Sequence, residues 1–417
     1  MNIAMIGSLP KHLGGSETGG ISIHTAQLSK NLADIGIKVS VLAQNITTAK
    51  MTFHREVDNY NIYSSVPNRS IACAKYIMGN LSRFRNTFPT NFNSMSIRER
   101  IALISLASRY LIFLDKVQPD IVHVHGGGLG LLASHMASKA LGVPLIATLH
   151  SLRGHMPDKL FTEQVIPSLI YPEGIICVSN YLENEAITYG VQKDKILVIP
   201  NGVDTDYFKP EDKNYARISL KVPPEQLNVL FVGNLIRRKG IDWLIKSFSK
   251  VCEAIPQATL YIVGGKVSDT DIRWYKDILD MANRLLPNGR VKFLGEMNSR
   301  HDPTLNLWYN VSDVLVLPSR AEGMGMVLLE AMACGKPVIG SRAGGITNVI
   351  RDSDNGILVD IDEINQLAEA IIRLLNDTKF STRLGNRGKM DVTAMYAWNN
   401  VATQTIKVYE NVLSSNR

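Results

Sequence analysis

Two glutamates, Glu322 and Glu330, bracket a short stretch that reads EGMGMVLLE. It follows an apolar run ending in Pro and Ser, DVLVLPS (313–319), so the pattern is a strand, a glycine turn and a helix. The unpaired N–H groups at a helix N-terminus bind anions, and carboxylates accept hydrogen bonds from sugar hydroxyls. A ligand with a diphosphate in the middle and a sugar at each end would satisfy both kinds of group. The stretch therefore predicts a nucleotide-sugar site.

A second group of charges lies in VGNLIRRKG (232–240), which places Arg237, Arg238 and Lys239 after an apolar run that reads as a strand. Cations at the carboxyl end of a strand can stabilise the negative charge that develops on a leaving diphosphate without a metal ion.

The first half of the chain carries a glycine-rich loop and several histidines. The segment KHLGGSETGGISIHTAQL (11–28) leads from a strand to a helix. His123 and His125 project to the same face of the strand DIVHVH (120–125), because strand side chains alternate with period two. The pattern alone does not choose between these two histidines.

Taken together, these motifs resemble the retaining GT-B glycosyltransferases of family 4. Two glutamates eight residues apart are weak evidence alone, but PSRAEGMGMVLLEAMACGKPVIGSRAGG (318–345) resembles the E-x7-E donor-site signature of that family. The similarity continues through VHVHG, TLH, VSNY, IPNGVD and VGNLIRRKG, and so covers nearly the whole chain. The resemblance implies an α/β protein with two Rossmann-like, doubly wound parallel sheets that face a deep cleft.

The resemblance also implies roles for the catalytic candidates. Glu322 would hold hydroxyls of the transferred sugar, and Lys239 matches a lysine of the family's motif. Where the family often has an arginine this chain has Asn234, so we expect Arg238 to supply the second cation and Arg237 to point to solvent. His125 would lie next to the anomeric carbon.

Among the donor-binding candidates, Glu330 would hold the ribose, about two turns into its helix, and backbone N–H groups would come from Gly323, Met324, Gly325, Met326 and Val327. Gly19 and Gly20 match the family's glycine pair, where a side chain would obstruct the donor phosphate or the acceptor. His24 and His150 are candidates for the acceptor side. Asn201, in IPNGVD, is expected to shape a turn near the hinge between the domains.

The reaction expected from the resemblance is transfer of a hexosyl or N-acetylhexosaminyl group from a nucleotide sugar to a hydroxyl acceptor. UDP-glucose or UDP-N-acetylglucosamine is the expected donor, and the reaction would proceed by same-face substitution with retention of anomeric configuration. Three alternatives stay open: a GDP-mannose-dependent transferase, a nucleotide-sugar 2-epimerase with the same layout, and a non-catalytic binding protein. The acceptor is not specified: a lipid-linked glycan, a small polyol or amino alcohol, and a growing polysaccharide all fit.

The domain organisation follows from alternating strand and helix patterns, which favour parallel βαβ units. Strands are expected at 2–7, 38–44, 120–125, 144–150, 174–179 and 195–201, and again at 227–233, 258–265, 290–296, 313–319, 337–341 and 356–360. We predict an N-terminal domain over 1–208, a linker over 209–226, where the apolar pattern lapses, and a nucleotide-sugar domain over 227–385. A helical segment over 386–417 would pack back toward the N-terminal domain.

Composition sets limits on other functions. The 417 residues contain no apolar run of the ~20 residues that a membrane span needs, and the N-terminus does not read as a signal peptide, which predicts a cytoplasmic protein. Four scattered cysteines suggest neither a disulfide framework nor a zinc site. Aspartate pairs in D-x-D spacing occur too often to identify a metal, so no metal and no cofactor are expected. The oligomeric state is not specified.

A basic segment accounts for most of the net charge of +7. Residues 69–109 hold Arg69, Lys75, Arg83, Arg85, Arg98, Arg100 and Arg109 against one acid, Glu99. Aromatic and apolar residues are interleaved, so this segment could contact the inner face of an anionic membrane or hold an acidic acceptor. A solvated helical face beside core aromatics is the alternative. No nucleic-acid-binding module is recognisable, and nucleic acid is not expected as a partner.

Overall fold

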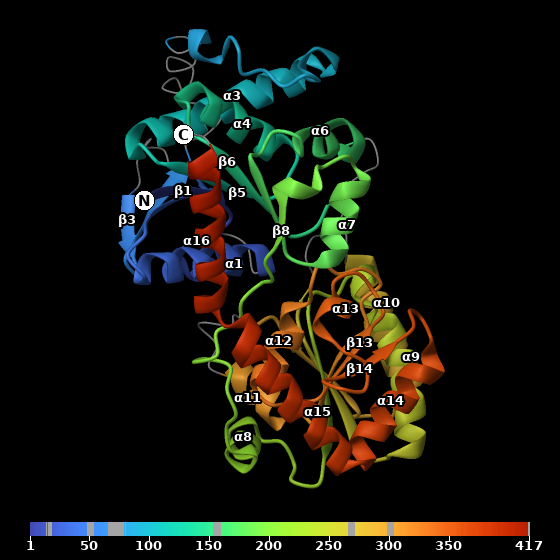
Figure 1. Ribbon diagram of the computed structural model, residues 1–417. Coiled ribbons are helices and arrows are strands. Elements are labelled where there is room, and N and C mark those ends of the chain that lie inside the picture. The colour runs from blue at the N-terminus through green and yellow to red at the C-terminus, as the bar shows by residue number, and fades with distance from the viewer. Residues whose placement is uncertain are drawn as a thin grey trace. The chain divides into compact units, whose positions relative to one another are not determined.

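The computed structural model describes residues 1–13, 15, 19–47, 54–65, 79, 81–152, 160–265, 272–297 and 304–415. The chain forms two compact units, coloured along its length in Figure 1. Unit 1 comprises Met1–Asn201 and Trp398–Arg417, and unit 2 comprises Gly202–Ala397. Each unit is an α/β structure built on one sheet, and each is described by itself below.

Unit 1 contains a sheet of order β3-β4-β2-β1-β5-β6-β7-β8, in which only β3 is antiparallel to its neighbour among the described strands. Its strands are β1 (Asn2–Gly7), β2 (Lys38–Thr47), β3 (His54–Val57), β4 (Tyr60–Ser65), β5 (Ile121–His125), β6 (Leu145–Leu149), β7 (Gly174–Cys177) and β8 (Ile196–Val198). Strands β1, β5 and β6 are buried along nearly their whole length, as central parallel strands require.

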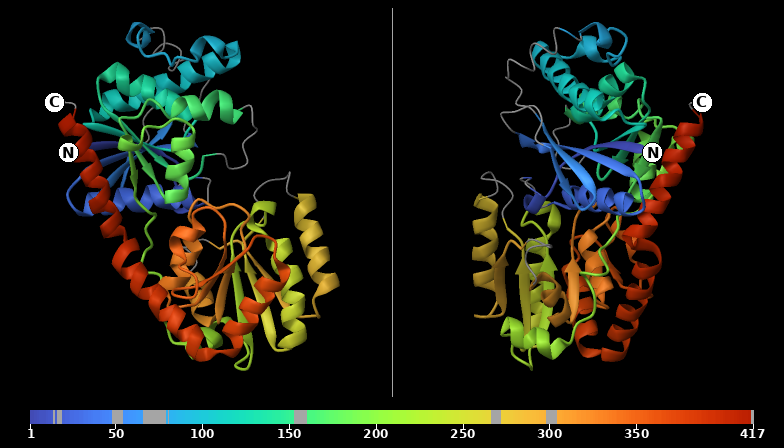
Figure 2. Two further views of the ribbon diagram at one scale, coloured as in Figure 1. Left: turned by 45° about the vertical axis from the view of Figure 1, so that its right-hand side comes forward. Right: turned by 90° about the vertical axis from the view of Figure 1, so that its left-hand side faces the viewer.

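Helices cover both faces of this sheet, as Figures 1 and 2 show. Helix α1 (Gly20–Asp34) packs with α16 (Trp398–Ser415) on one face, and α3 (Ile97–Val117) packs with α4 (Leu129–Leu141) on the other. The shorter α7 (Asn180–Thr188) follows β7. Helix α3 begins at a capping box, in which Ser96 and Glu99 satisfy each other's backbone N–H groups.

Unit 2 contains an all-parallel sheet of order β11-β10-β9-β12-β13-β14. Its strands are β9 (Leu227–Val232), β10 (Ala258–Val263), β11 (Val291–Gly295), β12 (Val314–Leu317), β13 (Val338–Ser341) and β14 (Ile357–Val359). One group of packed helices consists of α9 (Ile241–Ala254), α10 (Ile272–Leu285) and α14 (Ile364–Asn376), whose apolar residues join those of the strands in a single core. The other helices are α8 (Lys213–Leu220), α11 (Thr304–Val311), α12 (Met326–Ala333), α13 (Ile346–Val349) and α15 (Thr378–Asp391).

Both sheets reverse their strand order beside their first strand. In unit 1 this point lies between β1 and β5, and in unit 2 it lies between β9 and β12. Ligands of doubly wound sheets bind outside the carboxyl ends of the strands at such a point. The segments expected to carry function are therefore the loops that follow these strands, including residues 233–240 and 318–325.

The predicted strands agree with the structure in order and type, but the boundaries of two predicted segments differ from it. The expected linker 209–226 contains α8 and belongs to unit 2, and the change of unit falls between Asn201 and Gly202. Of the expected C-terminal segment 386–417, the part before Trp398 belongs to unit 2, and α16 belongs to unit 1. Charged residues and prolines over 209–226 mark a polar surface helix rather than a domain boundary.

One pair of strands was missed. Strands β3 and β4 form an antiparallel hairpin whose turn residues, Asp58 and Asn59, both have positive φ. Asp and Asn tolerate this conformation and favour two-residue hairpin turns, so the sequence did contain a signal for this turn.

Candidate active site

The two loops at the switch point of unit 2 are packed backbone against backbone. A side chain on Gly240 would place its Cβ 1.9 Å from the carbonyl oxygen of Pro318, and Gly240 has a positive φ of +67°. The Arg320 N–H donates to the Arg238 carbonyl at 2.7 Å, which joins the loops again. The cationic turn 237–239 is therefore held directly beside the loop that leads to Glu322.

Three side chains predicted to act together are in contact here. The Lys239 ammonium lies 2.5 Å from Oε2 of Glu322, and Nη1 of Arg238 lies 3.4 Å from the same oxygen. Arg238 also donates to the carbonyl of Ala321 at 2.6 Å. Burial favours a raised pKa for the Glu322 carboxyl, but the charges of Lys239 and Arg238 outweigh it and the pKa is lowered. The glutamate is thus ionised in a largely buried cationic setting.

Arg320 holds this cluster in place, and sequence reasoning did not single it out. Its guanidinium binds the carboxylates of Asp242 and Asp362 and donates to the carbonyl of Arg237 at 2.8 Å. These hydrogen bonds raise the pKa of Arg320. Arg237 itself is exposed, as expected, and its guanidinium covers the ring of Trp274 at 4.2 Å from the centroid.

Helix α12 begins where the loop ends. Gly325 caps it with φ +87°, and an added Cβ would lie 2.9 Å from Leu317, so only glycine fits this position without strain. The Leu328 N–H donates a hydrogen bond to the Gly325 carbonyl. The first-turn residues Met326 and Val327 are only partly buried. The first turn can therefore offer N–H groups to an anion.

The loop before the helix rests on a second glycine pair, Gly344 and Gly345. A Cβ on Gly345 would lie 1.8 Å from the carbonyl of Gly323, and one on Gly344 would lie 2.2 Å from the carbonyl of Glu322. The Gly345 N–H also donates to the Glu322 carbonyl at 2.9 Å. These contacts fix the backbone at Glu322 and Gly323, and they explain why the glycines of the AGG sequence belong to the motif.

Glu330 lies just over one turn into α12, closer to the N-terminus than expected, since the helix begins at Met326. Its side chain is buried, and Tyr309 of α11 donates to its Oε2 at 2.5 Å. Burial raises the pKa of the Glu330 carboxyl to about 7, although the Tyr309 hydrogen bond favours the ionised form. Burying a carboxyl group costs free energy unless the group is hydrogen-bonded. A ligand with hydroxyl groups could supply further hydrogen bonds to Glu330.

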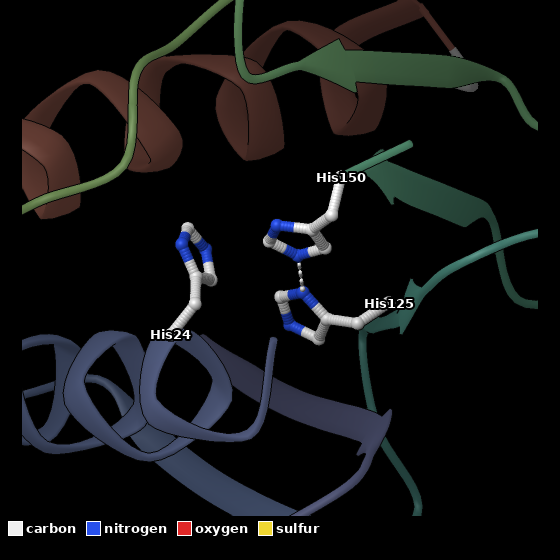
Figure 3. A group of neighbouring side chains, drawn as sticks. All are labelled: His24, His125 and His150. Carbon is white, nitrogen blue, oxygen red and sulfur yellow. Dashed lines mark hydrogen bonds between the residues drawn. The ribbon is translucent and has the colours of Figure 1, made fainter. Parts of the chain in front are cut away.

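In unit 1 the predicted histidines converge. His24 comes from α1, His125 ends β5 and His150 follows β6, and Figure 3 shows the three rings around one space. Nδ1 of His125 lies 3.3 Å from Nε2 of His150, and the His24 ring lies 5.3 and 4.6 Å from the other two centroids. Nε2 of His125 is buried without a hydrogen-bond partner among the described residues.

Burial keeps these rings uncharged. Desolvation lowers the pKa of His24 to about 4, and it lowers the pKa values of His125 and His150 well below the ordinary range. The neighbouring imidazoles add to this effect for His125, because each would repel a second positive charge. At neutral pH the cluster is therefore neutral.

His123 differs from His125 although both face the same side of β5. Its Nδ1 pairs with the Tyr409 hydroxyl and its Nε2 with the Thr148 hydroxyl, each at 2.7 Å, and the ring is fully buried. Both nitrogens are occupied, so His123 joins β5 to β6 and α16. His125 is the histidine that has a nitrogen left for a ligand.

Two further residues support the cluster. Nδ1 of His24 pairs with Oδ1 of Asn201 at 2.8 Å, so Asn201 does more than shape a turn. The indole of Trp398 meets the His24 ring edge to face at 5.1 Å. Neither contact could be read from the sequence, since Asn201 lies 177 residues from His24.

The glycine pair of the first loop is placed differently from the glycines of unit 2. Gly19 caps α1 with φ −79° and ψ 164°, and Gly20 is the first residue of the helix. A Cβ on Gly19 would meet nothing within 4 Å among the described residues. The described neighbours of Gly19 therefore leave room for a side chain, and a role for this glycine beside a ligand stays a prediction.

One group of described side chains could bind a metal ion. Within the described parts of the chain, one group of three or more potential ligands comes together, namely His24, His125 and His150, with one ring nitrogen of each inside 4.8 Å of the others. Neutral imidazoles are the ligands that zinc prefers, so this group is where a metal would bind if the protein held one. The expectation of a metal-free reaction stays a prediction.

The basic segment divides into buried and exposed parts. Phe84 is fully buried, and Arg83 forms a two-point ion pair with Asp115. Ile97 and Ile101, one turn apart on α3, are 75% and 64% exposed. Arg69 and Lys75 lie outside the described residues. No described helix is long and apolar enough to cross a membrane.

Comparison with known proteins agrees with this architecture. The family model described as Glycosyltransferase Family 4 matches residues 18–207, and the model described as Glycosyl transferases group 1 matches residues 212–391. An uncharacterized glycosyltransferase of Methanocaldococcus jannaschii is 28% identical over 94% of each chain. A D-inositol 3-phosphate glycosyltransferase of Nocardioides sp. is 25% identical over 95% of this chain and 86% of that protein.

Solved structures show the same fold. Sucrose-phosphate synthase from Thermosynechococcus elongatus superposes with a TM-score of 0.78 at 23% identity and covers 99% of both chains. Anabaena HepE, solved in complex with UDP-glucose, superposes with a TM-score of 0.73 at 19% identity and covers 99% of this chain and 100% of its own. The fold is GT-B, and the protein is an enzyme of the glycosyltransferase class. The chain belongs to the family 4 glycosyltransferases.

Proposed function

We propose that this glycosyltransferase moves a hexosyl or N-acetylhexosaminyl group from a UDP-sugar to a hydroxyl acceptor, with retention of configuration and without a metal ion. UDP-glucose and UDP-N-acetylglucosamine are the first donors to test, and GDP-mannose follows them. The observation that carries the proposal is the cluster of Arg238, Lys239 and Glu322 beside the N-terminus of α12, with Glu330 in the same helix.

The donor fits this cluster group by group. Lys239 and Arg238 would exchange their contact with Glu322 for the diphosphate, and the N–H groups of the first turn of α12 would add to their effect. Glu322 would then be free to accept hydrogen bonds from the transferred sugar, and Glu330 would accept them from the ribose. The complex of Anabaena HepE with UDP-glucose supports this choice of donor, because that protein shares the fold.

In the proposed reaction the bond between the anomeric carbon and the diphosphate oxygen breaks, and the acceptor oxygen bonds to the same face of that carbon. The acceptor proton passes to the departing phosphate oxygen. Negative charge grows on the diphosphate, where the two cations stabilise it. Positive charge grows on the sugar, and a neutral His125, with its electron-rich backbone carbonyl, suits that position better than a cationic ring would.

The names of relatives and the charge of one segment support one acceptor class over the others. The name D-inositol 3-phosphate glycosyltransferase, which recurs among the similar proteins, specifies a phosphorylated polyol. A small polyol or its phosphate is therefore the first acceptor to test, and the basic character of the segment 69–109 suits an acidic acceptor. Lipid-linked glycans and growing polysaccharides are the next classes.

A product assay tests this function. The enzyme is incubated in EDTA with each donor, with and without myo-inositol 3-phosphate or an acceptor library, and the products are analysed by mass spectrometry and by NMR coupling at the anomeric proton. We expect a glycoside with the donor's anomeric configuration. An inverted product would contradict the mechanism, and conversion of the sugar without acceptor would identify an epimerase instead.

We also propose that the exposed face of α3 contacts an anionic membrane surface. Ile97 and Ile101 are exposed on this helix beside Arg98, which combines apolar and basic groups as interfacial helices do. Sedimentation with vesicles of phosphatidylglycerol should carry the protein down at low salt. The variant Ile97→Glu/Ile101→Glu should stay in the supernatant. Equal recovery of both proteins in the supernatant would rule out this contact.

A further inference from the structure

Tyr309 is a buried residue that contacts Glu330, one of the predicted donor-binding residues. It lies on α11, which precedes β12, and its ring and hydroxyl are fully buried. The hydroxyl donates to Oε2 of Glu330 at 2.5 Å. Burial raises the pKa of Tyr309 well above its ordinary value, so the hydroxyl keeps its proton and acts as a donor.

Packing alone would not call for a tyrosine here. The ring packs edge to face with Phe208 at 5.5 Å, a contact that phenylalanine would make equally well. A buried hydroxyl group costs free energy unless it is hydrogen-bonded, and Glu330 supplies its bond. The reason for a tyrosine at position 309 therefore lies in its hydrogen bond to the Glu330 carboxylate.

Glu330 in turn needs a partner that fixes it. An ionised carboxylate can accept about four hydrogen bonds, so a bond at Oε2 leaves Oε1 with full capacity for a ligand. The Tyr309 bond restricts the rotation of the side chain and stabilises its ionised form against burial. A carboxylate whose side chain is already held in place loses less conformational entropy on binding two neighbouring hydroxyl groups than a freely rotating one does.

We propose that Tyr309 is a positioning residue for donor recognition, which holds the Glu330 carboxylate in the orientation that accepts hydrogen bonds from the ribose hydroxyls of the nucleotide. This inference rests on the proposed function, because it takes the ligand of Glu330 to be a ribonucleotide. It predicts that Tyr309 contributes to the preference for ribose over 2′-deoxyribose, although the tyrosine itself does not touch the ligand.

The test measures binding of UDP and of 2′-deoxy-UDP by calorimetry to the full chain. Four proteins are compared: wild type, Tyr309→Phe, Glu330→Gln and the double variant. A matched control is Tyr261→Phe, since Tyr261 is another buried tyrosine of unit 2 whose hydroxyl bonds to Gln226, away from the donor groups. Thermal unfolding of each protein shows whether the fold is kept.

We expect Tyr309→Phe to weaken UDP binding roughly 10- to 100-fold, as loss of a hydrogen bond to a charged group would do. The loss should be smaller for 2′-deoxy-UDP and absent when Glu330 is already Gln. In turnover the variant should raise the donor KM and leave kcat nearly unchanged. Tyr261→Phe should bind both nucleotides as the wild type does.

Unchanged UDP affinity in a folded Tyr309→Phe protein would overturn the inference and leave the proposed function intact. A loss of equal size in the Glu330→Gln background, or for both nucleotides, would overturn it too, because the effect would then not pass through Glu330 and the ribose. Failure of the wild type to bind any of UDP, GDP and ADP would instead contradict the proposed function.

Discussion

The functional groups of unit 2 are charged, and those of unit 1 are neutral. In unit 2, Lys239 and Arg238 surround an ionised Glu322. In unit 1, burial and mutual repulsion hold His24, His125 and His150 in their uncharged forms. Breaking a glycosyl phosphate bond creates negative charge on the diphosphate and positive charge on the sugar. The cations of unit 2 match the role proposed for them beside the diphosphate, and the neutral rings of unit 1 match the role proposed for His125 beside the sugar.

The glycines of the two regions differ in the same way. In unit 2, Gly325 and Gly345 are demanded by the fold, since a Cβ at either would strike neighbouring atoms. Gly19 of unit 1 has open space around its missing side chain among the described residues and an ordinary φ. The backbone of the loop before α12 is thus fixed by its neighbours, whereas the described neighbours of Gly19 leave room for a side chain.

The largest expected effect comes from removing charge in unit 2. Lys239→Ala should lower kcat/KM about 10²- to 10³-fold, the size typical of losing one group that stabilises developing charge. Arg237→Ala is the matched control, because this neighbouring cation covers Trp274 instead of contacting Glu322, and its effect should be about twofold or less. Equal losses in steady-state assays of the two variants would mean that position in the turn does not matter.

The second prediction separates the two histidines of β5. His125→Gln should lower kcat about 10²-fold with little change in stability, because His125 is proposed to lie next to the reacting carbon. His123→Ala should destabilise the fold by about 2 kcal/mol, since it leaves the buried Tyr409 and Thr148 hydroxyls without their bonds. Denaturant unfolding and steady-state kinetics of both variants check this. A stable but inactive His123→Ala protein would reverse the assignment.

The third prediction uses pH. The pKa of Glu330 is about 7 in the folded protein against an ordinary 4.5, so the folded state binds the extra proton between these values. Stability from this group is present at low pH and is lost as pH rises from about 4.5 to about 7. UDP, which needs the ionised carboxylate, should bind more tightly as pH rises from 6 to 8. Calorimetry should show a weaker trend for Glu330→Gln, because only the terminal phosphate of UDP then titrates near this range.

The smallest expected effects concern the glycines. Gly19→Ala should leave the unfolding free energy within about 0.5 kcal/mol of wild type, because the new methyl group meets none of the described residues, and should raise the donor KM if the donor lies against this glycine as proposed. Gly325→Ala should cost about 1–3 kcal/mol of stability, owing to its positive φ and the contact with Leu317. Thermal unfolding and KM measured on both variants decide the matter. A stable Gly325→Ala protein would show that the donor loop is not rigid.

Much of this could be predicted from the sequence, for physical reasons. Apolar periodicity predicted where the parallel strands lie along the chain, and the glycine turn with its flanking glutamates located the start of α12. Contacts between distant segments could not be predicted, because they depend on how helices pack. Tyr309 lies 21 residues from Glu330 and on another helix, and nothing local marks it. Arg320 was passed over because its partners, Asp242 and Asp362, are brought to it only by the sheet.

The central claim is that unit 2 binds a nucleotide sugar without metal through Lys239, Glu322 and Glu330. The most direct measurement is the thermal unfolding midpoint in EDTA with UDP, GDP, ADP, dTDP and NAD, for wild type and Glu330→Ala. The account predicts that UDP at 100 times its Kd stabilises the wild type by roughly 2.7 kcal/mol and so raises its unfolding midpoint. UDP should leave the midpoint of Glu330→Ala unchanged. Stabilisation by NAD alone, or by nucleotides only after Mg²⁺ or Mn²⁺ is added, would contradict it.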